Sequence, residues 1–278
     1  MSAVPPIAEV ILSFDNLGEA AEEERGLPVG PPPHFSVVEI LPRVVALLDE
    51  ASLRATFCVE AINVERYPEA LGSLVEQGHE LACHAWRHES WHSLDAPTRQ
   101  EVLRRSLAAL RSLDTEVTGF RPPGGLLDDA DFAGLAGQGI RWVSPAGSRA
   151  GLRDAVVCLP FAWRAIDAYY FAPALAPLRR RDGRSGESLD PADFARVAAR
   201  AVDEALRAPE GEPLCLVLHP FLYTSEERFE VLAELMGRLA GLHAAGEAHV
   251  GTARAAAERL RRRPGLAAPE LDRSTWSG

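Results

Sequence analysis

Hydrophobic and polar positions follow two alternating patterns along most of this chain of 278 residues. Short apolar runs rich in β-branched residues predict strands, and segments whose apolar residues recur every three or four positions predict helices. The expected strands lie at residues 7–14, 54–59, 81–84, 118–120, 140–143, 155–159, 214–218 and 249–251. The expected helices lie at residues 36–50, 67–77, 97–113, 129–137 and 190–208, with two more after residues 224 and 251.

Strands that alternate with helices predict an α/β fold whose parallel sheet is covered by helices. About seven to eight strands favour an irregular, distorted TIM-like (β/α) barrel over an open sheet, formed as a single domain by residues 1–263. We expect residues 264–278 to be a loosely ordered tail. Residues 18–34 and 161–189 break the pattern, and we interpret them as long loops that influence substrate choice.

Composition narrows the classes of function. The formal net charge of -11 argues against nucleic-acid binding, which needs a basic surface. All 29 basic residues are arginines, so Schiff-base lysine chemistry and the P-loop lysine are excluded. No CxxC pair occurs among the cysteines, and we expect four buried, reduced thiols. No run has the length of a membrane span and the first residues do not resemble a signal peptide, so we expect a cytoplasmic protein. Homo-oligomerisation stays open.

Two histidines, His84 and His88, follow the strand expected at 81–84. Their i, i+4 spacing puts both imidazoles on one side of a helical or tightly turned backbone. Neutral imidazoles that converge in this way are common ligands of a divalent transition metal. Zinc is the first expectation and cobalt or nickel the alternatives. In a chain with eight histidines, a pair unrelated to metal binding is the competing interpretation.

Other polar residues also fall where predicted strands end. Asp15 and Asn16 end the first strand, Arg121 and the run 122–125 follow the fourth, and His219 ends the strand at 214–218. In a parallel barrel these ends share one face, which is where active sites lie. A carboxylate, two imidazoles, a guanidinium and a further histidine on one face predict a metal-dependent hydrolytic site.

Four segments resemble, in order, the motifs of the polysaccharide deacetylase family (NodB homology, carbohydrate esterase family four). They are Ser-Phe-Asp-Asn at 13–16, His-Ala-Trp-Arg-His at 84–88, Arg-Pro-Pro-Gly-Gly at 121–125 and Leu-Val-Leu-His-Pro at 216–220. The resemblance extends from about residue 7 to residue 260. It implies a distorted (β/α) barrel and the hydrolysis of an amide with the help of a metal ion.

The resemblance also implies roles for single residues. Asp15 would be the catalytic base, Arg121 the residue that orients it, and His219 the catalytic acid. His84 and His88 would be the metal ligands. Asn16 stands where the family usually has a metal-binding aspartate, so the site would bind metal weakly, recruit Glu19, or have lost the metal.

The motifs indicate fewer residues for substrate binding than for catalysis and metal binding. Leu218 matches an apolar wall around the acyl methyl group, and Pro123 lies in the arginine-proline motif beside Gly124. Gly124 replaces a common aromatic residue but keeps the backbone N–H that an oxyanion hole needs. The usual aspartate-rich fourth motif is missing, and Asp167 is our candidate for a carboxylate that pairs with His219 or Arg121. A surface aspartate is the alternative.

Aromatic residues cluster near the predicted strand ends. A flat substrate such as a sugar ring could stack on them, although aromatic residues are also ordinary core material. The set comprises Trp86, Trp91, Trp142, Trp163, Tyr169 and Tyr170.

These patterns together predict a metal-dependent hydrolase of carbon–nitrogen bonds other than peptide bonds. It would remove an N-acetyl or N-formyl group from an amino sugar or small glycoside inside the cell. A ring-opening amidohydrolase that acts on a cyclic amide or ureide is the enzymatic alternative. A non-catalytic binding protein on the same fold is the alternative that Asn16 suggests.

Overall fold

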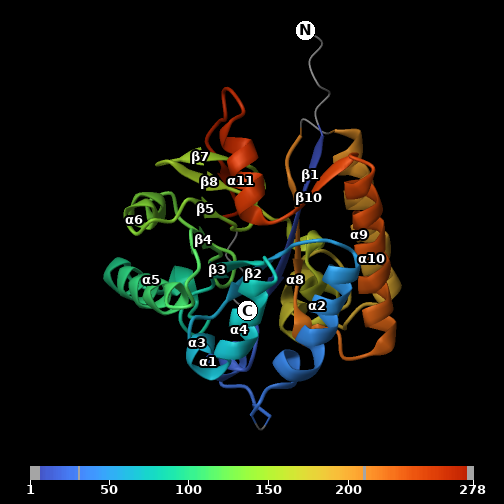
Figure 1. The fold of residues 1–278 in the computed structure, drawn as a ribbon, viewed down its shortest axis with the longest axis horizontal. Helices are drawn as coiled ribbons and strands as arrows, with labels where there is room; N and C mark the ends of the chain where they lie inside the picture. Colours follow the sequence, from blue (N-terminus) through green and yellow to red (C-terminus); the bar gives the residue numbers. More distant parts are fainter. Residues whose placement is uncertain (1–6, 31, 209–210, 274–278) are drawn as a thin grey trace.

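Strand β1 (Ala8–Asp15) runs through the centre of the fold in the computed structural model, which describes residues 7–30, 32–208 and 211–273 (Figure 1). All eight of its residues are buried. Along one edge β1 pairs in parallel with β9 (Leu214–Leu218). Along its other edge it pairs with β10 (Ala248–Gly251) in its first half and with β2 (Thr56–Val59) at its end. The end of β1 therefore lies between the ends of β9 and β2.

The sheet continues from β2 to a far edge. Its next strands, in spatial order, are β3 (Glu80–Cys83), β4 (Gly119–Phe120), β5 (Trp142–Val143), β8 (Val156–Cys158) and β7 (Gly151–Arg153). Neighbouring strands are parallel except β7 and β8. The carboxyl ends of the parallel strands thus share one face, and the predicted irregular (β/α) barrel is confirmed.

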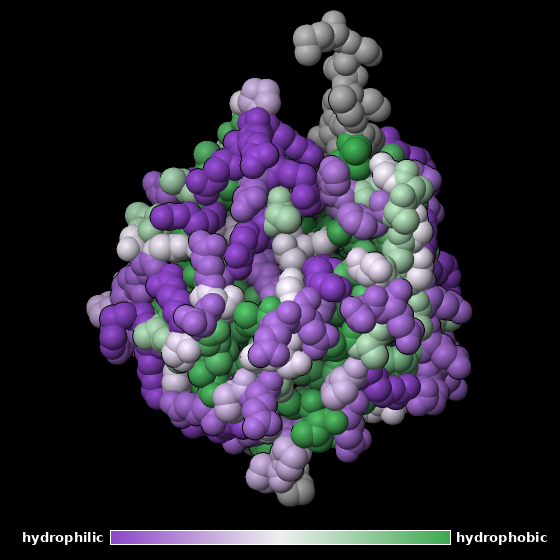
Figure 2. Space-filling model, in the orientation of Figure 1, coloured by the Kyte–Doolittle hydropathy of each residue, from purple (hydrophilic) through white to green (hydrophobic). Residues whose placement is uncertain are grey.

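Helices cover the outside of this sheet. They are α2 (Leu41–Glu50), α4 (Pro68–Glu76), α5 (Ala96–Arg111), α6 (Asp131–Gly137), α9 (Pro191–Arg207), α10 (Glu226–Ala244) and α11 (Ala253–Arg261). In Figure 1, α9 and α10 lie side by side along one flank, and α5 and α6 form the opposite flank. The face drawn in Figure 2 is largely hydrophilic, with hydrophobic residues visible between the helices.

Local sequence explains where the longer helices begin. The Asp95 side chain accepts a hydrogen bond from the Thr98 N–H at the start of α5, and Asp190 does the same for the Ala192 N–H at the start of α9. Both helices carry a proline in their first turn, where the missing N–H costs nothing.

The two segments interpreted as long loops contain short helices, so that part of the prediction was wrong. Residues 18–34 include α1 (Ala20–Glu24), and residues 161–189 include α7 (Asp167–Phe171) and α8 (Ala176–Arg181). All five residues of α7 are buried. Helices of five or six residues are too short to display a helical repeat, so the sequence pattern did not reveal them.

Part of the segment expected to be a loosely ordered tail pairs with the rest of the fold. Strand β11 (Glu270–Leu271) is antiparallel to β6 (Gly147–Arg149), and the Asp272 N–H donates to the Ala146 carbonyl over 2.9 Å. Gly147 permits this approach, because a Cβ atom there would clash with the Glu270 carbonyl. Residues 274–278 of that segment lie outside the described residues.

Two expectations from composition can be compared with the described residues. The four cysteines are free and buried, as predicted. Within the described ranges, no helix combines the length and the apolar character needed to cross a bilayer.

Candidate active site

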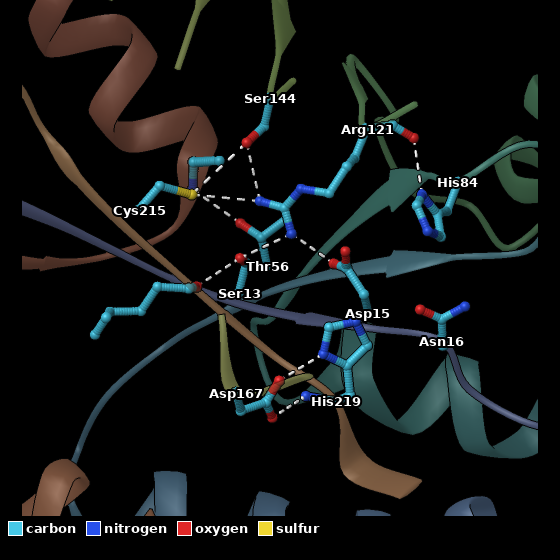
Figure 3. Close-up of polar contacts among 12 residues, drawn as sticks. Ser13, Asp15, Asn16, Thr56, His84, Arg121, Ser144, Asp167, Cys215 and His219 are labelled. Carbon is cyan, nitrogen blue, oxygen red and sulfur yellow. Dashed lines mark hydrogen bonds and ion pairs between the residues drawn. The ribbon is translucent and has the colours of Figure 1, made fainter. Parts of the chain in front are cut away.

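A buried ion pair joins the end of β1 to the residue that follows β4. Arg121 Nη1 lies 2.5 Å from Asp15 Oδ1 and 3.0 Å from Ser13 Oγ (Figure 3). Its Nη2 donates to Ser144 Oγ over 3.0 Å. Burial would raise the pKa of Asp15, but the charge and the hydrogen bond of Arg121 lower it overall. Asp15 is therefore a fixed, ionised carboxylate.

The two histidines after β3 lie against each other. The rings of His84 and His88 are 4.8 Å apart between centroids and nearly perpendicular. Ala85 and His88 both have positive φ angles, 64° and 74°, so the chain turns sharply between the two imidazoles. Burial lowers the pKa of His84 to about 4 and lowers that of His88 as well. Both rings are thus neutral, which is the form that binds metal.

The orientation of His84 is set by a backbone group. Its Nδ1 lies 2.8 Å from the Arg121 carbonyl oxygen, which can only accept a hydrogen bond. The proton is therefore on Nδ1, and the lone pair of Nε2 is left for another partner. A histidine held through its second nitrogen in this way is typical of metal sites.

A third group beside the histidines, Glu60, was missed in the sequence. Glu60 follows β2 directly and has no exposed surface. One of its carboxylate oxygens and one nitrogen from each of His84 and His88 lie within 4.8 Å of one another. Burial raises the pKa of Glu60 to about 8, and the charge of Asp15 contributes to the increase. The available signal was its position, since Glu60 ends an apolar strand just as Asp15 does.

The predicted metal position Asn16 lies beside Glu60. Its Nδ2 donates a hydrogen bond to Glu60 Oε1 over 2.8 Å. The backbone of Asn16 has a φ of 60°, a left-handed conformation that asparagine tolerates better than most residues. Glu19, the suggested substitute ligand, instead accepts hydrogen bonds from Arg66 and Tyr67.

A second buried pair lies at the end of β9. His219 Nδ1 is 2.6 Å from Asp167 Oδ1, and the His219 backbone N–H donates to Asp167 Oδ2 over 2.7 Å (Figure 3). Asp167 has no exposed surface, so the alternative of a surface aspartate is wrong. Of its two suggested partners, Asp167 contacts His219. Because Asp167 holds the ring through Nδ1, the other ring nitrogen of His219, Nε2, is available to a substrate.

The proline-glycine turn after Arg121 contributes a backbone group. Pro123 is buried, whereas Gly124 is exposed and has a φ of 79°. Among the described residues, no acceptor pairs with the Gly124 N–H. Trp163 is partly exposed and lies beside Gly125, because a Cβ atom on that glycine would be 3.2 Å from the indole. The turn and Trp163 therefore form one rim of the site.

Most of the aromatic residues considered for substrate stacking are core residues instead. Trp86 is 5% exposed and packs under the guanidinium of Arg105 on α5, 3.5 Å from the ring centroid. Trp142 is buried and donates to Glu80 at the beginning of β3, the opposite end of the sheet. The remaining buried members of the set are Trp91, Tyr169 and Tyr170, and Leu218 likewise has no exposed surface.

Comparisons with known proteins agree with this geometry. The family model described as polysaccharide deacetylase matches residues 6–143. Among curated relatives, the chitooligosaccharide deacetylase of Sinorhizobium fredii is 33% identical over 138 residues, which cover 46% of this chain and 60% of the relative. Across the curated relatives, the aligned part is 30% to 60% of the relative's length.

Solved structures support the fold over nearly the whole chain. A structure from Mycobacterium smegmatis assigned to the polysaccharide deacetylases has a TM-score of 0.78 at 21% identity, and the match covers 99% of this chain and 97% of that one. The Puue allantoinase has a TM-score of 0.70 at 15% identity, with coverage of 95% and 96%. The matched family model and the curated relatives lead to one conclusion: residues 6–143 have the sequence of a polysaccharide deacetylase family member, and the solved structures show that family's fold over nearly the whole chain.

Proposed function

We propose that this protein hydrolyses the N-acetyl group of an amino sugar with the help of a divalent metal ion. One observation carries the proposal. The ionised Asp15–Arg121 pair, the neutral pair His84 and His88, and the pair His219–Asp167 converge where parallel strands end. Figure 3 shows these residues apart from His88. An amide is a poor electrophile, and its hydrolysis calls for a base, an electrophilic group and an acid at one place.

The donor set suits a transition metal. His84 offers a free Nε2, His88 a neutral ring, and Glu60 a buried carboxylate within 4.8 Å of both. Two imidazoles and one carboxylate form a common ligand set for catalytic zinc, which leaves a position open for water and substrate. A zinc ion held by these three residues would polarise the amide carbonyl and lower the pKa of water toward 7.

Asp15 acts as the base in this proposal. Arg121 keeps it ionised and, with the Ser13 contact, fixes the direction of its free oxygen. Asp15 takes the proton from the attacking water as the bond to the acyl carbon forms. The Gly124 N–H donates to no acceptor among the described residues. In this proposal it stabilises the negative charge that develops on the carbonyl oxygen of the amide.

His219 acts as the acid. The Asp167 carboxylate accepts a hydrogen bond from the Nδ1–H of His219, which fixes the orientation of the ring and directs Nε2 away from Asp167. Nε2 then delivers a proton to the leaving amine as the carbon–nitrogen bond breaks. Asp15 then releases to solvent the proton that it removed from water, His219 takes up one proton from solvent, and the products are a carboxylic acid and a free amine.

Acetate release from a short N-acetylated oligosaccharide tests the proposal. The zinc-loaded protein, the chelator-treated protein and the His88→Ala variant are incubated with N-acetylchitooligosaccharides, and acetate and free amine are measured together with the bound zinc. We expect about one ion per chain and equal amounts of acetate and amine, both lost in the variant. Zinc binding without acid release from acetylated or formylated substrates would overturn the proposal and favour ring opening or simple binding.

A further inference from the structure

We propose that the carboxylate ligand of the metal in this chain is Glu60, directly after β2, and that the side-chain amides of Asn16 and Asn63 hold it in position as an amide cradle. Asn16 then acts as a positioning residue, although it occupies the place of the family's metal-binding aspartate. The proposal rests on the metal site of the proposed function and makes it more specific. With Glu60 as a ligand, the metal site keeps one negatively charged ligand although the residue at position 16 is neutral.

The hydrogen bonds around Glu60 define the cradle. Each carboxylate oxygen accepts from an amide, since Asn16 Nδ2 lies 2.8 Å from Oε1 and Asn63 Nδ2 lies 3.4 Å from Oε2. Asn63, the first residue of α3 (Asn63–Arg66), also donates to the Leu17 carbonyl over 2.6 Å. An ionised carboxylate, the form that binds metal, and a carbonyl can only accept, so both amides turn their NH₂ groups toward Glu60 and Leu17.

Charge gives an independent argument. Glu60 has no exposed surface, and no ion pair of the described residues includes it. Arg25 is close enough for its charge to act on Glu60 but forms no ion pair with it. A buried carboxylate surrounded by neutral donors is costly unless a cation is added. The adjacent neutral nitrogens of His84 and His88 complete a site that such a cation would occupy.

The same geometry explains why Asn16 is not an aspartate. A carboxylate at position 16 would place another negative charge at hydrogen-bond distance from Glu60 Oε1, where the charge of Asp15 already raises the pKa of Glu60. The asparagine at position 16 therefore depends on the glutamate at position 60, because the contact needs one amide and one carboxylate. Exchanging the two functional groups keeps one amide and one carboxylate in the contact and only reverses the direction of the hydrogen bond.

The exchange is the test, read as zinc affinity by competition titration and as zinc content after dialysis. We expect Glu60→Gln to weaken zinc binding about 100-fold or more, as loss of a charged ligand does, and Asn16→Ala to weaken it about 10-fold. The double variant Asn16→Asp with Glu60→Gln should bind within about 10-fold of the original chain. Glu19→Gln is the matched control, since Glu19 is also buried but pairs with Arg66, and its affinity should not change.

Two results would overturn the proposal. One is a Glu60→Gln variant that binds zinc like the original chain while Asn16→Ala does not, which would make Asn16 itself the ligand. The other is a double variant that binds no better than Glu60→Gln. Should a variant fail to fold, a crystal structure of the zinc-loaded original chain decides the question. A Glu60 oxygen about 2.0–2.2 Å from the ion supports the proposal, and an Asn16 oxygen there contradicts it.

The metal readouts keep this proposal separate from the proposed function. If zinc binding depends on Glu60 and the exchange restores it, the ligand assignment stands even when no acetate is released. If acetate is released but zinc binding does not depend on Glu60, the function stands and the cradle is rejected.

Discussion

Glu60 and Glu80 are buried carboxylates associated with neighbouring strands, but their surroundings differ. Glu80 begins β3 and accepts hydrogen bonds from the Thr56 hydroxyl, the Trp142 indole and Arg254. Its contact with the Arg254 N–H also ties it to the first turn of α11. Glu60 follows β2 at the other end of the sheet, and among the described residues the side chains that donate to it are two neutral amides.

The comparison separates a carboxylate that supports the fold from one that is available to a ligand. Burial raises the pKa of both residues, to about 8 at Glu60, and the donors around Glu80 counteract that effect. A buried charge that is paired within the chain makes its removal costly for folding. A buried charge without an ion-pair partner lowers stability until a cation binds. The two ends of the sheet should therefore respond to substitution in opposite ways.

The largest effect is expected at the site end, from Asp15→Asn. Asparagine keeps the size of the side chain and an oxygen for Arg121, but it cannot accept a proton from water. We expect turnover to fall about 10³-fold or more, which corresponds to about 4 kcal/mol of barrier. Acetate release measures the loss, and zinc content should stay at that of the original chain. Turnover within 10-fold of the original would show that Asp15 is not the base.

At the opposite end, Glu80→Gln should lower the free energy of unfolding by about 3 kcal/mol. Glutamine places an NH₂ group among the donors of Thr56, Trp142 and Arg254, so at least one buried donor loses its acceptor. Urea unfolding at constant m value measures the change. Zinc affinity serves as the control and should not move. A variant that unfolds like the original chain but binds zinc poorly would reverse the roles assigned to the two ends.

The matched change at the site, Glu60→Gln, should have the opposite sign in metal-free protein. Without metal, burial raises the pKa of Glu60 to about 8, so folding near neutral pH must protonate this carboxyl at a cost in free energy. Glutamine removes that cost and keeps the contact with Asn16, so the free energy of unfolding should rise by about 1–2 kcal/mol. Zinc at 100 times its dissociation constant should stabilise the original chain by about 2.7 kcal/mol and the variant far less. Chemical unfolding with and without chelator gives both values. A metal-free variant less stable than the original would show that Glu60 already supports the fold.

The sequence predicted the part of the site that depends on strand ends. Asp15, His84, Arg121 and His219 each follow an apolar run, and parallel pairing brings such positions to one face. The order of strands and helices, and hence the barrel, could be predicted for the same reason. Asp167 was singled out as a partner of His219 or Arg121, and the contact with His219 needed the structure.

Contacts between distant segments could not be predicted from the pattern. Glu60 ends a strand as Asp15 does, but its role depends on Asn16 and Asn63, which lie in different segments. Trp142 was expected near the site, yet its indole donates to Glu80 at the other end of the sheet. A two-residue strand such as β5 gives no sign of the direction in which its aromatic side chain extends.

The smallest expected effect concerns His79, which precedes Glu80 at the end of the sheet opposite the active site. Its Nδ1 accepts a hydrogen bond from the Ala55 N–H, and burial, with a contribution from Arg54, lowers its pKa to about 4. The unfolded chain, with a histidine pKa near 6.5, takes up the proton first as the pH falls. The stabilising contribution of neutral His79 is therefore complete above about pH 6.5 and is lost between about pH 6.5 and pH 4.

The free energy of unfolding decreases when the pH falls from 7.5 to 5.5, and this decrease should be about 1 kcal/mol smaller in His79→Gln than in the original chain. Comparing the variant with the original chain cancels the titration of the other groups. Equal pH dependence in the original chain and His79→Gln would mean that the ring is protonated as easily in the folded protein as in the unfolded one. The stability of this end of the sheet would then depend on Glu80 and its hydrogen-bond donors, and the buried imidazole of His79 would not contribute to its pH dependence.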